Sequence, residues 1–507
     1  MKLSSLIHPF LFGIYPVVFL FSHNADEVFL TDTYFSFIVS LITTSGIVTL
    51  FWLIYKNITK AGIASSVFIL FFTLYWLLYK LFLKINIENH LVVVSFSALI
   101  LILVLVALAK RKGELEKVAK LFTVISATLI LMAVYELAMY QWRNSVKWSA
   151  EEITGQDIQV SNAGNSSDKP DIYYIILDGY ANHHTLKQLY NYDNSEFLTF
   201  LENKKFKVIP QSRTNHSITF LSLSSSLNMM YDTVLTPKIG KYSHDRKLTY
   251  QMIKHNKVTK FLTDQGYRYI HVSSGWGPTN ENVLADKNIQ FTRINNFEMM
   301  LIQLSMLNPF AKYILGEVMI KRALKTFDVI GKEIPQLQGP KFVFAHLLIP
   351  HPPFLFKANG EKTPWREVDL RTSKWEDNDN YLEQLKFTNT KVKTMVEEIL
   401  SHSKNDPVII IQSDHGPGHS FENYDTTGGW DHPSATNLNE KMRIIHAVHL
   451  PGNANSIFYD SITPVNSFRT LFNHYFKANL PILGDKSYYS NPMKPYDFIE
   501  VTDKVSF

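Results

Sequence analysis

The chain has 507 residues, a formal net charge of +5 and no cysteine. The lack of cysteine excludes disulfides, cysteine nucleophiles and thiolate metal sites, so any chemistry rests on His, Asp, Glu, Ser and Thr. The modest positive charge is spread along the chain, which gives no indication of nucleic-acid binding. A chain of this length is expected to hold more than one domain.

The first third of the sequence is strongly apolar. It contains five stretches of about 20 residues, the length that a helix needs to cross a bilayer. The expected spans are Leu3–Ser22, Tyr34–Tyr55, Ile63–Phe82, Leu91–Ala109 and Leu121–Trp142. The first span, with its basic start at Lys2, also suits a signal peptide, although no small-residue cleavage site follows it. Residues 1–142 are therefore predicted to form a transmembrane domain of about five helices.

The distribution of Lys and Arg in the short loops predicts the orientation of these spans. Cytoplasmic loops retain an excess of positive charge. An N-terminus inside the cell places most of the loop cations in the cytoplasm: Lys2, Lys56, Lys60, Lys110, Arg111, Lys112, Lys117 and Lys120. Five crossings then put everything after Trp142 on the outside. We therefore expect a multi-pass protein of the cell (inner or plasma) membrane with an extracytoplasmic domain.

Residues 143–170 are rich in Ser, Asn, Gly, Asp and Glu, which is typical of a linker, and residues 171–507 are expected to form the folded domain. Short apolar runs in this domain alternate with helix-like segments such as Thr249–Gln265 and Tyr381–Ser401. The runs are Ile172–Leu177, Tyr267–Val272, Phe342–Leu348 and Val408–Ile411. The expected fold class is a multi-pass α-helical membrane domain followed by an α/β sandwich with a mostly parallel sheet.

Polar residues stand where three of these strands end. Asp178 follows the first strand, His346 and His351 lie at and after the third, and Asp414 and His415 follow the fourth. The carboxyl ends of parallel strands line the functional crevice of an open α/β sheet, so these side chains are expected to converge. Alone, each is as readily a turn residue or a buried histidine. Together, two carboxylates and an imidazole suit a divalent cation such as Zn²⁺ or Mn²⁺.

The segment Ser212–Met229 is the candidate source of a nucleophile, and it has the pattern of a polar loop running into a helix. A hydroxyl near the start of that helix would face its N-terminus, which stabilises a phosphoryl group. Spacing alone leaves four candidate hydroxyls open, and each could equally be a simple helix cap. They are Thr214, Ser217, Thr219 and Ser222.

Several of these motifs resemble membrane-anchored sulfatase-like proteins of the alkaline phosphatase superfamily. The motifs are Asp178-Gly-Tyr, Ser212-Arg-x-Asn with the hydroxyl-rich run after it, Pro350-His-Pro-Pro-Phe and Ser413-Asp-His-Gly. Lipoteichoic acid synthases and lipid A phosphoethanolamine transferases are relatives of this kind, and they too join five membrane helices to an extracytoplasmic domain. The resemblance covers most of the region from Asp171 to about Tyr489.

The resemblance implies that Asp178, Asp414 and His415 bind the metal and that Thr219 is both nucleophile and fourth ligand. His351 would bind substrate or act as an acid. Three further histidines are candidates for a second metal or phosphate site: His346, His419 and His432. The transferases have Glu where this chain has Asp178, which leaves the close subfamily open.

The resemblance also bears on the reaction. True sulfatases use a formylglycine made within a Cys/Ser-x-Pro-x-Arg motif, and the nucleophile segment contains no such motif, which argues against sulfate-ester hydrolysis. We expect metal-dependent transfer of a phosphoryl-linked head group from a membrane phospholipid to an envelope glycan or lipid through a phospho-threonine. If water replaces the acceptor, the protein is a membrane-anchored phosphodiesterase. A non-catalytic scaffold of the same fold is the alternative from another class.

Overall fold

The computed structural model describes residues 3–113, 115–144, 148–155, 158, 169–365, 367–368, 370, 375, 378–422 and 429–507, and most of the predicted linker 143–170 lies outside them. The described chain divides into two compact units. The first is Met1–Lys147 with Arg293–Leu315, and the second is Trp148–Thr292 with Gly316–Phe507. The segment Arg293–Leu315 therefore groups with the N-terminal helices, although the sequence placed it within the folded domain 171–507.

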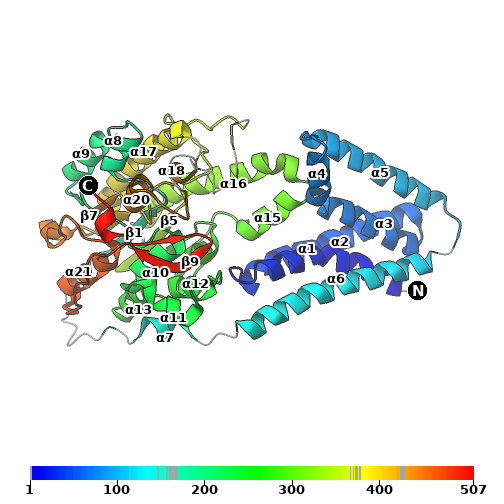
Figure 1. Cartoon of the computed structure of the whole chain (residues 1–507), viewed down its shortest axis with the longest axis horizontal. Coiled ribbons are helices and arrows are strands. Elements are labelled where there is room, and N and C mark those ends of the chain that lie inside the picture. The colour runs from blue at the N-terminus through cyan, green and yellow to red at the C-terminus, as the bar shows by residue number, and fades with distance from the viewer. Residues whose placement is uncertain are drawn as a thin grey trace. The chain divides into compact units, whose positions relative to one another are not determined.

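The first unit is helical (Figure 1). Its helices are α1 (Ile7–His23), α2 (Tyr34–Tyr55), α3 (Ile58–Thr73), α4 (Tyr75–Leu83), α5 (His90–Lys110), α6 (Glu116–Arg143) and α15 (Asn296–Leu304). Among the described residues, three segments are long and apolar enough to cross a membrane, or four if the bent pair α3 and α4 forms one span. Helix α1 is apolar but has only 17 residues. These helices indicate a membrane anchor.

The expected single span Ile63–Phe82 is broken. Helices α3 and α4 meet at Leu74 with a bend of 50°. Two tyrosines hold α4 against the start of α5: the Tyr75 hydroxyl lies 2.8 Å from Nδ1 of His90, and the Tyr79 ring stacks on the His90 ring at 4.0 Å. These contacts favour the bent path over a straight helix.

The segment Arg293–Leu315 is fixed to the N-terminal helices by specific contacts. Ser36 Oγ of α2 donates to Glu298 Oε1 of α15 at 2.9 Å. The backbone N–H of Met306 donates to the Phe72 carbonyl of α3 at 2.8 Å. Phe297 is buried in a cluster with apolar residues of α1. A stretch distant in sequence thus completes the helical unit.

The second unit is built on a mostly parallel sheet. In the part of the chain that the structure describes, seven strands form it in the order β2-β7-β6-β1-β5-β3-β4. The strands are β1 (Ile172–Leu177), β2 (Lys207–Val208), β3 (Arg268–Val272), β4 (Lys287–Ile289), β5 (Lys341–Leu347), β6 (Val408–Gln412) and β7 (His446–His449). Among the described strands of this sheet, β7 alone runs antiparallel to its neighbours, β6 and β2. A separate hairpin is formed by β8 (Tyr488–Asn491) and β9 (Lys494–Glu500).

Helices cover both faces of this sheet (Figure 1). The helices that lie wholly or partly in this unit are α7 (Ala150–Thr154), α8 (His183–Leu189), α9 (Ser195–Asn203), α10 (Thr219–Asn228), α11 (Thr236–Ile239), α12 (Lys247–Lys254), α13 (Lys257–Asp264), α14 (Gly277–Asn280), α16 (Asn308–Asp328), α17 (Asn378–His402), α18 (His419–Glu422), α20 (Ala435–Met442) and α21 (Pro464–Phe476). Alternate residues of β1 face opposite sides: Tyr173 joins the core beneath α17, while Tyr174 packs on Phe468 of α21 at 5.0 Å. The predicted α/β sandwich is confirmed.

The predicted strands match β1, β3, β5 and β6 to within a residue. The predicted helix Thr249–Gln265 is instead two helices, α12 and α13. Asn256 breaks it, because its side chain accepts a hydrogen bond of 2.7 Å from the Thr259 N–H and so caps α13.

Candidate metal centre

Two buried carboxylates lie side by side where neighbouring strands end. Strands β1 and β6 pair in parallel with Ile176 opposite Gln412, and Asp178 and Asp414 each stand two residues further on. The two carboxylates are 4% and 0% exposed. Because each aspartate lies two residues beyond a paired strand residue, the two side chains come together, as expected for the carboxyl edge of a parallel sheet.

His415 completes a cluster of three candidate ligands. Its Nε2 lies 3.3 Å from Oδ2 of Asp414 and 3.8 Å from Oδ1 of Asp178. Each of the three residues offers one ligand atom, and these atoms all lie within 4.8 Å of one another. One divalent cation can reach all three at ordinary bonding distances.

The unpaired oxygens of the cluster fit such a cation. Within the described ranges, Asp178 Oδ1 and Asp414 Oδ2 are buried and have no hydrogen-bond partner. A buried carboxylate oxygen without a partner is costly, and a metal ion removes that cost. Two oxygens and one imidazole nitrogen are a donor set that Zn²⁺ and Mn²⁺ accept.

The charges around the three candidate ligands also favour a bound cation. Burial and the neighbouring Asp178 carboxylate raise the pKa of Asp414 to about 6. Burial opposes the charge of Asp178 as well, but His351, His346 and His415 hold the pKa of its carboxyl below the usual range. Burial, together with Lys441, lowers the pKa of His415, so its ring is neutral as a metal ligand must be. Without a cation, the two carboxylates repel each other.

Thr219 is the first residue of α10 and reaches the cluster. Its Oγ1 lies 3.0 Å from His415 Nε2, and its side chain is half-buried. Ser222, one turn later, anchors α10 by donating to the Asp414 carbonyl at 2.8 Å. The start of a helix carries a partial positive charge, so a hydroxyl and an incoming phosphoryl group are both placed where anionic charge is stabilised.

The other three candidate hydroxyls are engaged elsewhere. Thr214 Oγ1 donates to the His216 carbonyl at 2.9 Å, and Ser217 Oγ donates to the Ser490 carbonyl at 3.2 Å. Ser222 is committed to Asp414 as described, and all three side chains are buried. Among the four, Thr219 has the hydroxyl that contacts a candidate ligand side chain.

His351 lies beside the cluster. Its backbone N–H donates to the Asp178 carbonyl at 3.0 Å. Its Nδ1–H donates to the Pro352 carbonyl at 2.8 Å, which leaves Nε2 to exchange a proton. The His351 ring is centred 6.2 Å from the His415 ring and packs edge-on against Trp375 at 4.8 Å. A half-buried imidazole held in this way suits a proton donor.

The three remaining histidines have different surroundings. His346 is buried, with Nε2 3.3 Å from Oδ2 of Asp178. His419 has both ring nitrogens occupied, Nδ1 by the Trp375 carbonyl and Nε2 by the Asn378 amide, each at 3.1 Å. His432 is exposed. Among the described residues, the cluster of ligand atoms includes neither His419 nor His432.

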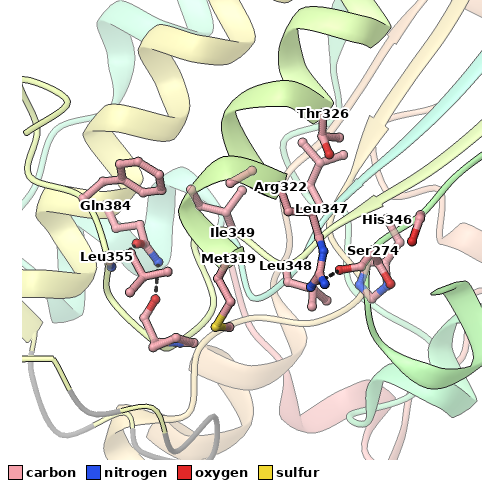
Figure 2. Close-up of a pocket in the computed structure, with 14 residues that line it drawn as sticks. Ser274, Met319, Arg322, Thr326, His346, Leu347, Leu348, Ile349, Leu355 and Gln384 are labelled. Carbon is pink, nitrogen blue, oxygen red and sulfur yellow. Dashed lines mark hydrogen bonds between the residues drawn. The ribbon is translucent and has the colours of Figure 1, made fainter. Parts of the chain in front are cut away.

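A small cavity of about 40 Å³ lies next to His346. Figure 2 shows Ser274 and Arg322 beside His346, and Nη1 of Arg322 donates to the Ser274 carbonyl at 3.2 Å. Gly275, with φ of +86°, lies under this guanidinium, and a Cβ there would come within 1.8 Å of it. The cavity has room for about one water molecule, so it is no substrate pocket.

Lys441 is a residue of the site that the sequence did not reveal. Its Nζ lies 3.1 Å from Nδ1 of His415 and over the rings of Trp375 and Trp430, at 5.6 and 5.8 Å from their centres. Burial lowers the pKa of Lys441 to about 8. In the sequence it is one polar residue of a short amphipathic helix, and no motif distinguishes it from an exposed lysine.

The chain is similar to one protein family and to several solved structures. The chain matches the Sulfatase family over residues 198–444, a range that includes Thr219, His351, Asp414 and His415 and begins after Asp178. No curated protein matches the sequence.

Among solved structures, the C-terminal periplasmic domain of EptC from Escherichia coli is 13% identical, with a TM-score of 0.45, over 69% of this chain and 98% of that one. The same domain in complex with Zn is 12% identical, with a TM-score of 0.44, over 69% and 98%. The corresponding domain of the phosphoethanolamine transferase EptC from Campylobacter jejuni is 12% identical, with a TM-score of 0.38, over 63% and 94%.

The second unit therefore carries a sulfatase-family catalytic domain. The chain is therefore an enzyme, and its apolar N-terminal helices provide a membrane anchor.

Proposed function

We propose that this enzyme transfers a phosphoryl-linked head group from a membrane lipid to an extracytoplasmic acceptor, with Thr219 as the nucleophile. The observation that carries the proposal is the 3.0 Å contact between Thr219 Oγ1 and His415 Nε2 at the start of α10. It supports a hydroxyl held within the ligand cluster, where an attacking oxygen is needed.

Asp178, Asp414 and His415 would hold a divalent cation, Zn²⁺ or Mn²⁺, with Thr219 Oγ1 as the fourth ligand. When bound, such a cation lowers the pKa of the hydroxyl and neutralises charge on the phosphoryl oxygens. The chemistry of the donor set and the buried unpaired oxygens Asp178 Oδ1 and Asp414 Oδ2 support this assignment.

In the first half-reaction, the deprotonated Oγ1 of Thr219 attacks the phosphorus of the lipid head group. An Oγ1–P bond forms and the P–O bond to the diacylglycerol breaks. The departing oxygen takes a proton from Nε2 of protonated His351, the nitrogen that the Pro352 contact leaves available. The head group is then held on Thr219 as a phosphodiester.

In the second half-reaction, an acceptor hydroxyl attacks the same phosphorus. Its proton passes to Nε2 of His351, the P–Oγ1 bond breaks, and Thr219 is returned to its starting state. The partial positive charge at the start of α10 stabilises the anionic phosphoryl oxygens in both steps. The nature of the acceptor, an envelope glycan or lipid or else water, decides between transfer and hydrolysis.

The membrane anchor supports a lipid donor and an external acceptor. Apolar helices keep the catalytic domain at a bilayer, and the excess of Lys and Arg in the loops assigned to the cytoplasm favours a catalytic domain on the opposite side. The donor is thus proposed to be a glycerophospholipid of the same membrane.

The test uses the full chain in vesicles that contain a phospholipid labelled in its head group, with a glycolipid as acceptor. We expect release of diacylglycerol that requires a divalent cation and is lost in Thr219→Ala, while the control Ser217→Ala retains activity. Label on the acceptor supports transfer, and label released into the buffer supports the phosphodiesterase instead. No release of diacylglycerol by the wild-type chain would overturn the proposal.

A further inference from the structure

A chain of buried side chains runs from the carboxylate of Asp178 away from the ligand cluster. His346 Nε2 lies 3.3 Å from Asp178 Oδ2, and His346 Nδ1 lies 3.0 Å from Thr279 Oγ1. Thr279 Oγ1 in turn lies 2.7 Å from Ser274 Oγ. His346, Thr279 and Ser274 are 2%, 0% and 4% exposed, so bulk solvent does not compete for these contacts.

The contacts at the two ends of this chain, those of Ser274 and Asp178, indicate which group donates in each hydrogen bond. Ser274 Oγ accepts a hydrogen bond of 2.9 Å from the Trp276 N–H. Its own proton has two acceptors within reach, Thr279 Oγ1 at 2.7 Å and the Trp276 carbonyl at 3.4 Å. The choice between them follows from the other end of the chain of contacts, because a lone pair on His346 Nε2 would be repelled by Oδ2 of Asp178 at 3.3 Å. Nε2 therefore carries the proton and Nδ1 accepts from Thr279, whose oxygen then accepts from Ser274. Each hydroxyl has one proton, so Thr279, which accepts from Ser274, donates to His346 Nδ1.

These donor and acceptor roles agree with one tautomer of His346. A neutral imidazole whose Nδ1 accepts a hydrogen bond carries its proton on Nε2. Within the described residues, His346 Nε2 makes no hydrogen bond that meets the usual limits on distance and angle. The carboxylate oxygen beside it is Oδ2 of Asp178, 3.3 Å away. His346 therefore presents an N–H to Asp178 and does not offer a lone pair to a cation.

The surroundings hold this chain in place. His346 lies on β5 opposite Ile176 of β1. The Ser274 N–H donates to the Thr279 carbonyl at 3.1 Å, and Arg322 donates to the Ser274 carbonyl, as Figure 2 shows. These contacts fix the backbone of the turn and so hold the hydroxyl oxygens of Ser274 and Thr279 close together.

We propose that His346 is a positioning residue: it donates Nε2–H to Oδ2 of Asp178, and Thr279 and Ser274 set the tautomer that allows this. Asp178 is then left with Oδ1 for the cation. The inference rests on the metal site of the proposed function and departs from the resemblance, which made His346 a candidate for a second metal or phosphate site.

The test measures zinc affinity of the full chain in detergent, stripped of metal and titrated with Zn²⁺ against a chromophoric chelator. Thr279→Val keeps the shape but removes the donor, so the dissociation constant should rise about 10- to 100-fold, as for other partners that orient a metal ligand. Thr279→Ser restores the hydroxyl and should bind zinc like the wild type. Ser274→Ala, one step further away, should shift the affinity in the same direction as Thr279→Val.

Two substitutions of His346 itself should differ clearly in their effect on zinc affinity. His346→Gln offers an amide N–H to Asp178 and a carbonyl to Thr279, and it should retain zinc affinity, whereas His346→Leu should lose it to the extent that Thr279→Val does. Zinc K-edge X-ray absorption should count one imidazole, that of His415. The unfolding temperature of each metal-free variant checks that it folds.

Two imidazoles at the zinc, or a His346→Gln variant as weak as His346→Leu, would overturn the inference and make His346 a ligand. Unchanged affinity in Thr279→Val and Ser274→Ala would overturn it as well, with the metal site left standing. A wild-type chain that binds no zinc or manganese would overturn the proposed function and this inference together, so the two failures are distinguishable.

Discussion

The backbone N–H of Gly179 donates a hydrogen bond of 3.2 Å to Oδ1 of Asp414 and so joins the turn after β1 to the loop after β6. Glycine is needed at this position for two reasons. Its φ is +73°, and a Cβ there would lie 2.6 Å from Cη2 of Trp375. The turn that places Asp178 therefore depends on the absence of a side chain in the next residue.

The substitution Gly179→Ala should be strongly destabilising. The positive φ costs roughly 1–2 kcal/mol, and the overlap with Trp375 adds a further cost of about 1–3 kcal/mol. Gly266→Ala is the matched control, because Gly266 has φ of +82° and an added Cβ would meet no heavy atom of the described chain within 4 Å. Urea unfolding followed by tryptophan fluorescence measures both variants. Equal losses of unfolding free energy would contradict the packing argument.

The metal ligands give the second prediction. Asp178→Ala, Asp414→Ala and His415→Ala should each lower the amount of bound zinc or manganese and abolish turnover, because a site with one ligand removed holds the ion poorly. Elemental analysis after desalting measures the metal content. His432→Ala is the control: His432 is exposed, so this substitution should leave the metal content unchanged. Wild-type stoichiometry in all three ligand variants would show that the site is misassigned.

Metal affinity should depend on pH through Asp414. Its pKa in the metal-free site is raised to about 6, so below that pH a cation must displace a proton from this carboxyl. For one displaced proton the affinity falls by about tenfold per pH unit as the pH drops below the pKa. It should level off above the pKa, because the carboxyl is already ionised there. A zinc titration from about pH 5 to about pH 8 checks this, since that range spans the raised pKa. A break near the ordinary pKa of an aspartate would contradict it.

Thr219 gives the most discriminating prediction for the reaction. Thr219→Ala should remove all turnover, and Thr219→Ser should keep part of it, because serine supplies the same hydroxyl without the methyl group that restricts its rotamers. Ser217→Ala loses the hydrogen bonds that its hydroxyl makes with the carbonyl and the N–H of Ser490, and it should cost about 1–3 kcal/mol of stability without removing turnover. Mass spectrometry of a trapped intermediate should place the added mass on the peptide that contains Thr219. A modified peptide elsewhere would refute the assignment.

The orientation of the membrane helices can be tested with reporters. A reporter fused after Lys169 should be active only outside the cytoplasm, and one fused after Lys112 should be active only inside. The number of crossings decides the outcome: α1 must cross, and α3 with α4 must form one span, for five crossings to be made. Cytoplasmic activity after Lys169 would exclude the proposed external acceptors.

The parts of the fold that the sequence predicted share one property: each is fixed by local pattern. The run Ile172–Leu177 is apolar throughout because β1 is buried on both faces, so its end, and with it Asp178, could be located. The short strand β2 has two residues and exists only because β7 lies beside it, and no local pattern marks such an element.

The residues of the site also differ in whether a local sequence pattern predicts them. Asp178, Asp414 and His415 directly follow predictable strands, so their convergence follows from the parallel sheet. Lys441 reaches His415 from α20, and that contact depends on how distant segments pack. The tautomer of His346 depends on Thr279 and Ser274, which the pattern of strand ends does not connect to it.

The grouping of Arg293–Leu315 with the N-terminal helices has a topological consequence. The chain passes between the two units three times: near residue 147, before Arg293 and within α16 after Leu315. Cleavage at the linker alone would leave the catalytic domain fastened through α15, whose Phe297 and Glu298 are buried among the N-terminal helices. A single proteolytic nick would therefore not shed the enzyme from the membrane, and its release would require cuts on both sides of Arg293–Leu315 in addition to the cut at the linker.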